Sequence, residues 1–346
     1  MKKTRIAING FGRIGRLFYR QIAHRDDLEL VAVNDLGNQE NLAYLFKYDT
    51  VYGPWRGEVS ADASAGTITV DGRVIKVLQE KEPTKLPWGA LDIDILIEAT
   101  GLFESFEKAS VHLEAGAKHV LLTAPAKDKE GTAGGGTILM GVNDEKLKGC
   151  RITSNASCTT NSAAPIMQIL SETIGVKKAI LGTVHAMTTT QSLADAPVHK
   201  GKDFRRGRAA SYNIVPSTTG SAIAVARAVP SLAHKFDGIA YRIPISTGSL
   251  SDITFISARP TTVEEINEIF KKAEREPRWQ GIMKTTEDQL VSSDIVGQPY
   301  GAIVDLSFTK VVDGDLVKVL SWYDNEWGYV ATLVRHVLAT ANHHRD

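Results

Sequence analysis

The fold of this chain is decided by residues 6–35, which read IAINGFGRIGRLFYRQIAHRDDLELVAVND. A short apolar run at residues 6–8 comes first, and apolar side chains then recur at helical spacing between Ile14 and Ile22. A second apolar run follows at residues 28–33. This order predicts a strand, a helix and a second strand, which together form one unit of a parallel sheet covered by helices.

Glycines in the turn between the first strand and the helix indicate a dinucleotide site. Gly10, Gly12 and Gly15 have the spacing that lets the backbone approach a pyrophosphate at the N-terminus of a helix. Asp35 ends the second strand, where its carboxylate can accept hydrogen bonds from the adenosine ribose and repel a 2′-phosphate. The alternative is a glycine-rich turn in some other α/β protein, with Asp35 only capping a strand end. We predict NAD as the cofactor, with contacts from Gly10, Phe11, Gly12, Arg13, Ile14, Gly15 and Asp35.

The strand and helix pattern continues beyond this unit. Apolar runs at residues 93–99 and 120–123 predict two further strands, and residues 105–115 predict a helix between them. Near-continuous apolar strands that alternate with helices are typical of a parallel sheet covered on both faces. Residues 127–136 are charged and then glycine-rich, and we expect a surface loop there.

Polar residues follow both of these later strands. Thr100 and Gly101 come after the first of them, and Thr123 comes after the second. Because ligands of parallel sheets bind at the carboxyl ends of the strands, we expect all three residues beside the cofactor. Hydrogen bonding at a strand end is an equally good interpretation of the two threonines.

Length and composition limit the classes of protein. The chain has 346 residues, which suits two domains, and its 40 Lys+Arg residues balance its 40 Asp+Glu residues. Neither nucleic acid nor a membrane is therefore expected as a partner. The N-terminus runs straight into a strand pattern with no signal peptide, and only two cysteines occur. We expect a cytoplasmic protein without disulfides.

Cys158 is the candidate nucleophile. It lies in a cluster of short hydroxyl and amide side chains, residues 154–161, ahead of a predicted helix in which Pro165 is expected within the first turns. A helix N-terminus lowers the pKa of a thiol, and the thiolate is the reactive form. His185, after a strand at residues 179–184, is the candidate base. The alternatives are a buried, inert cysteine and a structural histidine. No metal site is expected.

The chain as a whole resembles the glyceraldehyde-3-phosphate dehydrogenase family. The resemblance covers essentially the full length, and the octet around Cys158 and a run from Asp324 to Tyr329 are its most specific parts. Its other marks are residues 8–16, 99–101, 184–188, 205–208 and 217–220.

The resemblance implies an α/β fold in two domains. A Rossmann-type dinucleotide-binding domain would span residues 1–157 and be completed by a C-terminal helix at 325–346. An α+β catalytic domain with a largely antiparallel sheet would span residues 158–324. The family also implies a homotetramer.

The family's chemistry assigns roles to the candidate residues. Cys158 would form a thiohemiacetal with glyceraldehyde 3-phosphate, His185 would accept the proton, and hydride transfer to NAD would leave a thioester. Inorganic phosphate would then release 1,3-bisphosphoglycerate. Asn325 would hold the nicotinamide carboxamide, and Tyr329 would pack near that ring. The residues that would hold the two anions are Ser157, Thr159, Thr188, Arg205, Thr219, Gly220 and Arg242. Arg206 and Arg208 are interpreted as surface charges or subunit contacts.

Two departures from the family and three rival functions remain open. Ser162 replaces a cysteine that many relatives carry, and residues 245–248 differ near the expected wall for the substrate phosphate. Erythrose-4-phosphate dehydrogenase, which releases an acid by hydrolysis, is the nearest rival, but Thr188 and residues 218–220 favour phosphate turnover. A nucleotide-binding regulator would not need both Cys158 and His185. A cysteine hydrolase without redox chemistry would not need the dinucleotide motif.

Overall fold

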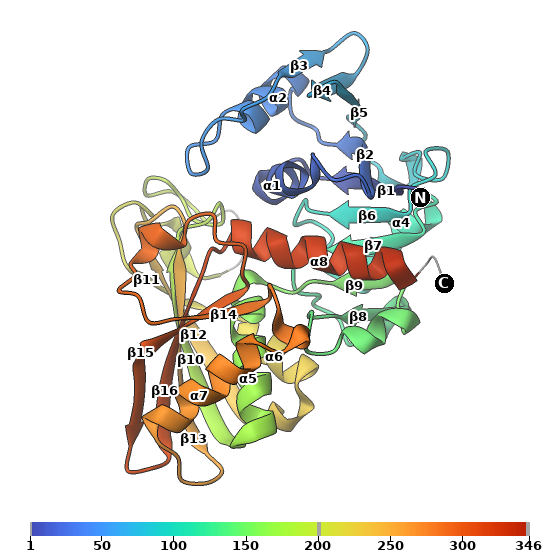
Figure 1. Ribbon diagram of the computed structural model, residues 1–346. Coiled ribbons are helices and arrows are strands. Elements are labelled where there is room, and N and C mark those ends of the chain that lie inside the picture. The colour runs from blue at the N-terminus through green and yellow to red at the C-terminus, as the bar shows by residue number, and fades with distance from the viewer. Residues whose placement is uncertain (1, 199–201, 344–346) are drawn as a thin grey trace. The chain divides into compact units, whose positions relative to one another are not determined.

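The computed structural model describes residues 2–198 and 202–343, which form two compact units. Unit 1 comprises Met1–Ile138, Asp144–Ala156 and Leu333–Asp346, and unit 2 comprises Leu139–Asn143 and Ser157–Thr332. The last helix therefore belongs to both units. Residues 344–346 of the expected C-terminal segment lie outside the described residues. Figure 1 shows the helices and strands of both units.

Unit 1 is built on a nine-stranded sheet with the order β3-β4-β5-β2-β1-β6-β7-β9-β8. Its central strands run parallel, as the apolar runs predict, and the β3–β4 and β4–β5 pairs are antiparallel. The strands are β1 (Thr4–Asn9), β2 (Leu28–Asn34), β3 (Val59–Asp62), β4 (Thr67–Val70), β5 (Arg73–Leu78), β6 (Ile95–Glu98), β7 (His119–Leu122), β8 (Gly135–Thr137) and β9 (Ile152–Ser154).

The helices of unit 1 confirm the predicted start of the chain. Leu17, Phe18 and Ile22 of the first helix are buried, because their spacing puts them on one face of it. The helices are α1 (Arg13–Ile22), α2 (Gln39–Lys47), α3 (Phe106–Ala109), α4 (Val111–Glu114) and the later part of α8 (Trp327–His343).

Two predictions in unit 1 hold for most of their length and differ at one point each. The helix expected at residues 105–115 is divided at Ser110, whose hydroxyl donates to the Glu107 carbonyl and thereby competes with the helical pattern. The loop expected at residues 127–136 ends in buried strand β8. A Cβ at position 135 would collide with the Phe106 ring, so only glycine fits in this edge strand.

Unit 2 contains a seven-stranded mixed sheet with the order β11-β12-β10-β13-β16-β15-β14. The sheet is largely antiparallel, as the family implies, but the β10–β12 and β14–β15 pairs are parallel. Asp313 and Gly314 both have positive φ in the β15–β16 turn, as the tight turn of a hairpin requires. The strands are β10 (Val176–Ala186), β11 (Val215–Thr218), β12 (Phe236–Ile243), β13 (Ser249–Ser257), β14 (Met283–Thr286), β15 (Ala302–Val312) and β16 (Leu316–Tyr323).

Helices α5 (Cys158–Thr173), α6 (Ser221–Ala228) and α7 (Val263–Glu274) belong to the same unit. The Thr262 hydroxyl accepts a hydrogen bond from the Glu265 N–H and caps α7. Pro165, however, is the eighth residue of α5 and not part of its first turns. It cannot donate to the Asn161 carbonyl, and Gly301 packs against that oxygen instead.

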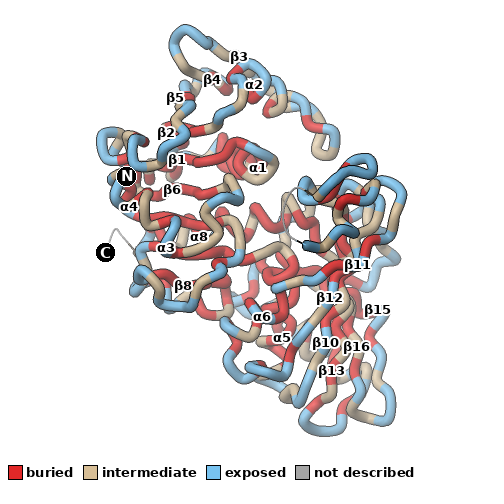
Figure 2. Tube along the Cα trace, turned by 180° about the vertical axis from the view of Figure 1, so that it is seen from behind, coloured by how far each residue is buried: buried red, intermediate tan, exposed pale blue. Residues whose placement is uncertain are grey.

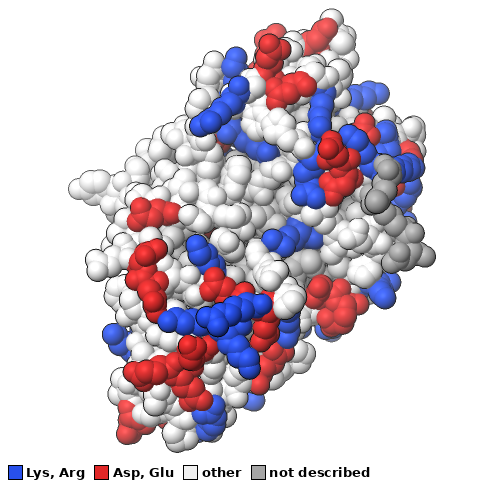
Figure 3. Space-filling model, viewed as in Figure 1, with Lys and Arg blue, Asp and Glu red and all other residues white. Residues whose placement is uncertain are grey.

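Burial follows the sheets in both units (Figure 2). On the face drawn in Figure 3, Lys and Arg alternate with Asp and Glu, without a large patch of one sign. Within the part of the chain that the structure describes, no helix is long and apolar enough to cross a membrane. No cluster of potential metal ligands occurs among the same residues.

Candidate active site and dinucleotide groove

The glycine loop of unit 1 joins β1 to α1 through close backbone contacts. Gly10 has a φ of 96°, and a Cβ on it would lie 2.7 Å from the Ala99 carbonyl carbon. A Cβ on Gly15 would lie 2.3 Å from the Gly10 oxygen. Both positions therefore require glycine, and the loop can lie flat over the end of β6.

Asp35 connects this loop to the chain that leaves β2. Its Oδ2 accepts from the Phe11 backbone N–H at 2.8 Å, and its Oδ1 accepts from Gly37 N–H at 2.8 Å. The carboxylate lines a groove of about 420 Å³ at the carboxyl edge of the sheet. Groove residues are Asn9, Gly10, Gly12, Asn34, Asp35, Leu36, Glu80, Lys81, Pro83, Leu86, Ala99, Thr100, Leu102 and Phe103.

The other predicted cofactor residues of unit 1 do not line this groove. Phe11 is buried, and Arg13 forms an ion pair of 2.6 Å with Asp49. Gly101 is exposed, and the Thr123 hydroxyl donates to the Glu98 carbonyl at 3.1 Å. Thr123 thus fits the strand-end interpretation that the sequence left open. Half-buried Ile14 lies in the first turn of α1.

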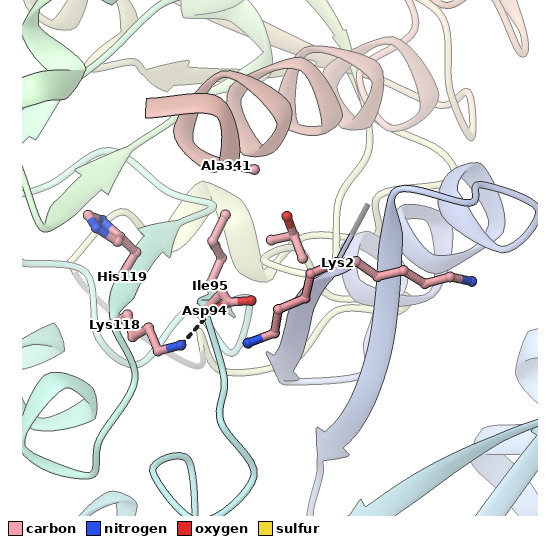
Figure 4. A pocket seen from close by; sticks show the side chains of 8 residues that line it. Lys2, Asp94, Ile95, Lys118, His119 and Ala341 are labelled. Carbon is pink, nitrogen blue, oxygen red and sulfur yellow. Dashed lines mark hydrogen bonds and ion pairs between the residues drawn. The ribbon is translucent and has the colours of Figure 1, made fainter. Parts of the chain in front are cut away.

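A second cavity, of about 280 Å³, lies at the amino edge of the same sheet (Figure 4). Two of the three lysines that line it are already engaged, because Lys118 pairs with Asp92 and Asp94 at 2.7 Å and Lys2 pairs with Asp92 at 3.1 Å. Ligands of parallel sheets bind at the carboxyl edge. The groove beside Asp35 is therefore the candidate dinucleotide site.

Cys158 is the first residue of α5. Ser157 caps the helix by accepting from the Thr160 N–H at 3.1 Å. The Cys158 Sγ lies 3.3 Å from the His185 Nε2, so the two candidates that the sequence selected are in contact. This distance is within reach for proton transfer between the thiol and the imidazole.

The His185 ring is oriented by the strand beside it. His185 on β10 pairs in register with Arg242 on β12, and the Arg242 Nη1 lies 2.7 Å from Nδ1 and 3.1 Å from the Ala186 carbonyl oxygen. Nδ1 also lies 2.7 Å from that oxygen. Arg242 can only donate, so it donates to Nδ1 when that nitrogen carries no proton and to the Ala186 oxygen when it does. Only the tautomer with a proton on Nδ1 leaves Nε2 free to accept the Cys158 proton.

Burial decides the ionisation of this pair. It lowers the pKa of His185 to about 3, with the Arg242 charge as the next cause. Burial also raises the pKa of Cys158, although the positive charge of Arg242 opposes the shift. This is the reverse of the lowered thiol pKa that the sequence analysis expected at a helix N-terminus. Both shifts favour a neutral thiol beside a neutral imidazole over an ion pair.

Tyr323 completes the surroundings of the pair, and the sequence analysis did not identify it. Its hydroxyl lies 2.8 Å from the hydroxyls of Thr159 and Thr183, and its ring meets the His185 ring edge-on at 6.0 Å. Burial raises the Tyr323 pKa. Its inward position on β16 could have been read from the alternating pattern, but its partners could not.

Asn325 lies buried in unit 2 with its side-chain carbonyl fully used. Oδ1 accepts from the Ser249 hydroxyl at 2.9 Å, the Gly248 N–H at 3.2 Å and the Thr247 hydroxyl at 3.3 Å. The amide nitrogen is therefore the group that can donate to a ligand. Two residues of the departing segment 245–248 thus hold Asn325. Tyr329, also buried, donates its N–H to the Asp324 carbonyl.

The expected anion residues form two hydroxyl clusters. In the first, the Ser157 hydroxyl lies 3.0 Å from that of Ser221, which accepts from Thr219 at 2.9 Å beside Gly220. In the second, Thr188 lies 2.9 Å from Thr190, hydroxyl to hydroxyl. Ser221 and Thr190 were not predicted. Their hydroxyls add donors beside Thr219 and Thr188.

Of the two arginines predicted to bind an anion, Arg205 contacts neither hydroxyl cluster among the described residues. Arg205 is exposed and forms an ion pair of 2.7 Å with Asp203. Arg206, interpreted as a surface charge, instead donates to the Ser217 hydroxyl at 2.6 Å and the Thr190 hydroxyl at 3.2 Å. Its charge also lowers the pKa of Arg242, after burial as the main cause. Arg206, not Arg205, is thus near the second cluster, and adjacent arginines give no sequence signal to separate them.

Comparison with known proteins agrees with this geometry. A family profile described as the NAD binding domain of glyceraldehyde 3-phosphate dehydrogenase matches residues 4–106, and one described as the C-terminal domain matches residues 157–325. A glyceraldehyde-3-phosphate dehydrogenase of Streptomyces coelicolor is 48% identical over 95% of this chain and 96% of its own length. A protein of the same name from Clostridium pasteurianum is 46% identical over 96% of this chain and 97% of its own length. Glyceraldehyde-3-phosphate dehydrogenase 3 of Kluyveromyces marxianus is 44% identical over the same shares of the two chains.

Proposed function

The chain belongs to the glyceraldehyde 3-phosphate dehydrogenase family, and from this premise we propose how its own residues carry the reaction. It is an NAD-dependent oxidoreductase that oxidises glyceraldehyde 3-phosphate in glycolysis. The observation that carries the proposal is the 3.3 Å contact between the Cys158 Sγ and the His185 Nε2. A thiol beside a neutral imidazole can add to an aldehyde and transfer its proton in the same step.

The residues at the dinucleotide groove fit the cofactor. Gly12 is the N-cap of α1 and supplies no side-chain cap, so an anion could bind the N–H groups at the start of this helix. The Asp35 carboxylate lines the groove, where it could bind a ribose. Bound NAD would supply a hydride acceptor. Asn325 would donate its amide N–H to the nicotinamide carboxamide, and Tyr329 would pack near that ring.

The protein's own residues form the covalent bond to the substrate and move the protons. Cys158 Sγ forms a bond to the aldehyde carbon, and His185 Nε2 takes the thiol proton and passes it to the carbonyl oxygen, which becomes a hydroxyl. Loss of a hydride from that carbon, which bound NAD would accept, returns the hydroxyl proton to His185 and leaves a thioester on Cys158. Attack by inorganic phosphate on the thioester carbon breaks the C–S bond and releases 1,3-bisphosphoglycerate, and the leaving thiolate takes the proton back from His185.

We assign the two anions to the two hydroxyl clusters and the arginines beside them. Ser157, Thr159, Thr219 and Gly220 would bind one phosphate group. Thr188 and Arg242 would bind the other. Arg206 donates to the Thr190 hydroxyl of the second cluster and its charge acts on Arg242, so it would add a positive charge to the same site. A guanidinium binds phosphate through a planar fork of donors.

The two adjacent arginines provide a matched pair of variants. Arg206→Ala is expected to raise KM for phosphate or substrate about tenfold or more, because it removes a charge-assisted hydrogen bond. Arg205→Ala should change either KM by less than about twofold, since Arg205 pairs with Asp203 at an exposed position. Steady-state kinetics with varied phosphate check both values. The reverse ranking would restore Arg205 to the site.

A homotetramer is the assembly that we propose. Ile180 on β10, with Ile239 and Tyr241 on β12, is exposed on one face of the unit 2 sheet. Phe308 on β15 is exposed too. Large apolar side chains gathered on one sheet face are typical of a surface that a second copy covers.

We also propose a cytoplasmic location. Both cysteines, Cys150 and Cys158, are free thiols, and a catalytic thiol needs a reducing compartment to stay active.

Formation of NADH from glyceraldehyde 3-phosphate, recorded with and without inorganic phosphate, tests the proposed function. Phosphate-dependent turnover would support release of an acyl phosphate. Turnover that is indifferent to phosphate would indicate thioester hydrolysis and favour the erythrose-4-phosphate alternative, which the same assay checks with that aldehyde. Absence of turnover with NAD still bound would direct attention to residues 245–248.

A further inference from the structure

A buried hydrogen-bond chain lies beneath the dinucleotide groove. Asn34, Asn9 and Glu98 are the last residues of three adjacent strands, β2, β1 and β6, and they pair in register. All three are buried, with exposed fractions of 5%, 3% and 3%. The proposed chemistry at Cys158 uses none of them. Two of them, Asn9 and Asn34, nevertheless line the groove.

Glu98 is the centre of this chain because its carboxylate takes part in four of the hydrogen bonds. Oε1 accepts from the Thr100 N–H at 2.8 Å and from the Thr100 hydroxyl. Oε2 accepts from the Asn9 amide at 2.6 Å and contacts the His112 Nε2 at 3.1 Å. The Thr100 hydroxyl oxygen itself accepts from the Leu102 N–H, so its own proton points to Glu98. Four donors on two oxygens are the full set that a carboxylate side chain takes here.

The direction of the bonds is fixed from the far end as well. Trp88 has only an N–H to offer, and it donates to the His112 Nδ1 at 3.3 Å. The His112 proton must then be on Nε2, which faces Glu98. His112 and Trp88 are fully buried and do not line the groove.

On the other side the chain reaches the groove wall. Asn9 donates to Glu98, so its Oδ1 accepts from the Asn34 amide at 2.7 Å. Asn34 then binds the backbone of Glu80 twice, through the Glu80 oxygen at 3.0 Å and the Glu80 N–H at 2.9 Å. Glu80 lines the groove, and Asn34 immediately precedes Asp35. The orientation of the Asn34 amide depends on Asn9, and the orientation of the Asn9 amide depends on the Glu98 carboxylate.

We propose that Glu98 is a positioning residue for the adenosine half of NAD, which it serves without contact by fixing Asn9, Asn34 and Thr100 in the groove. The inference rests on the proposed function, since it takes this groove as the NAD site. Replacing one carboxylate oxygen with an NH₂ group puts a donor against two donors, whichever way the new amide turns. The bond directions then fail along the whole chain.

The test compares Glu98→Gln with Glu107→Gln, an exposed carboxylate in the same unit that also loses one charge. Titration with NAD and with ADP-ribose, which lacks nicotinamide, is expected to give Kd values raised about tenfold for Glu98→Gln and unchanged for Glu107→Gln. KM for NAD should rise in parallel, while kcat at saturating NAD falls less than about twofold. Alkylation of Cys158 by iodoacetamide without NAD should proceed at the wild-type rate, because Cys158 lies in unit 2.

A second pair of variants keeps the carboxylate and decides the matter if Glu98→Gln does not fold. His112→Phe removes one donor to Glu98 outside the groove and should raise the Kd for NAD several-fold. His112→Gln can accept from Trp88 and donate to Glu98, so it should restore most of the affinity. Equal affinity of the two His112 variants, or of folded Glu98→Gln and wild type, overturns the inference alone. A wild-type protein that does not bind NAD overturns the proposed function and this inference with it.

Discussion

Cys158→Ser is expected to lower the rate of NADH formation by at least about 10⁴-fold. The serine hydroxyl is a much weaker acid than the thiol, and the base beside it is weak because burial lowers the pKa of His185 to about 3. Such an imidazole can help a thiol to react but cannot deprotonate an alcohol to a useful extent. The covalent intermediate would then form too slowly to measure, although the serine is nearly the same size.

Cys150→Ser is the control for this variant, because Cys150 is the other free cysteine and lies in unit 1. We expect it to keep wild-type turnover. Both variants should bind NAD with wild-type affinity, since the groove beside Asp35 contains neither cysteine. Turnover by Cys158→Ser within about tenfold of wild type would show that the reaction does not use a thiohemiacetal on this residue.

Local patterns were enough to predict much of this fold. The strand, glycine turn, helix and strand of residues 6–35 follow from apolar spacing and from two glycines that cannot carry a Cβ. The contact between Cys158 and His185 was also predicted, although 27 residues separate them, because nucleophile and base are chemically complementary. Residue type therefore predicts a partnership that spacing alone does not.

The structure differs from the sequence-based expectations where tertiary contacts decide between similar residues. Arg205 and Arg206 are neighbours of one type, and only Asp203 on one side and Ser217 on the other separate their roles. The thiol pKa of Cys158 was expected to fall at a helix N-terminus, but burial outweighs that effect here. A short stretch of sequence predicts neither the burial of a side chain nor the direction of a guanidinium.

The segment 245–248 shows the same limit from another side. It departs from the family pattern, and sequence alone placed its effect at the substrate phosphate. In the structure Thr247 and Gly248 bind the Asn325 side chain, and Thr247 also donates to Asp324. The departure therefore bears on the group proposed to hold nicotinamide, which is a long-range pairing that no local pattern predicts.

His185→Asn is expected to lower kcat by about 10²- to 10⁴-fold, the range for loss of a positioned base. Because burial lowers the pKa of His185, we expect that its protonation does not cause a loss of activity between pH 8 and pH 5. Because the pKa of Cys158 is raised, the rate of thiol alkylation in the wild type should keep rising at alkaline pH. In His185→Asn, alkylation by iodoacetamide at pH 7 should be slower and its pH profile should move to higher pH.

The control for this variant is His234→Asn, since His234 is an exposed residue of unit 2 whose φ of 60° suits asparagine. It should keep both the wild-type rate and the wild-type alkylation profile. The profile separates two accounts of His185. A thiolate–imidazolium pair would give wild-type alkylation that is already fast and flat near pH 6, and loss of the histidine would abolish that plateau. A neutral pair, which burial favours here, gives no plateau in the wild type, and the histidine then acts only when the thiol attacks. A plateau near pH 6 would therefore overturn the neutral pair while leaving Cys158 as the nucleophile.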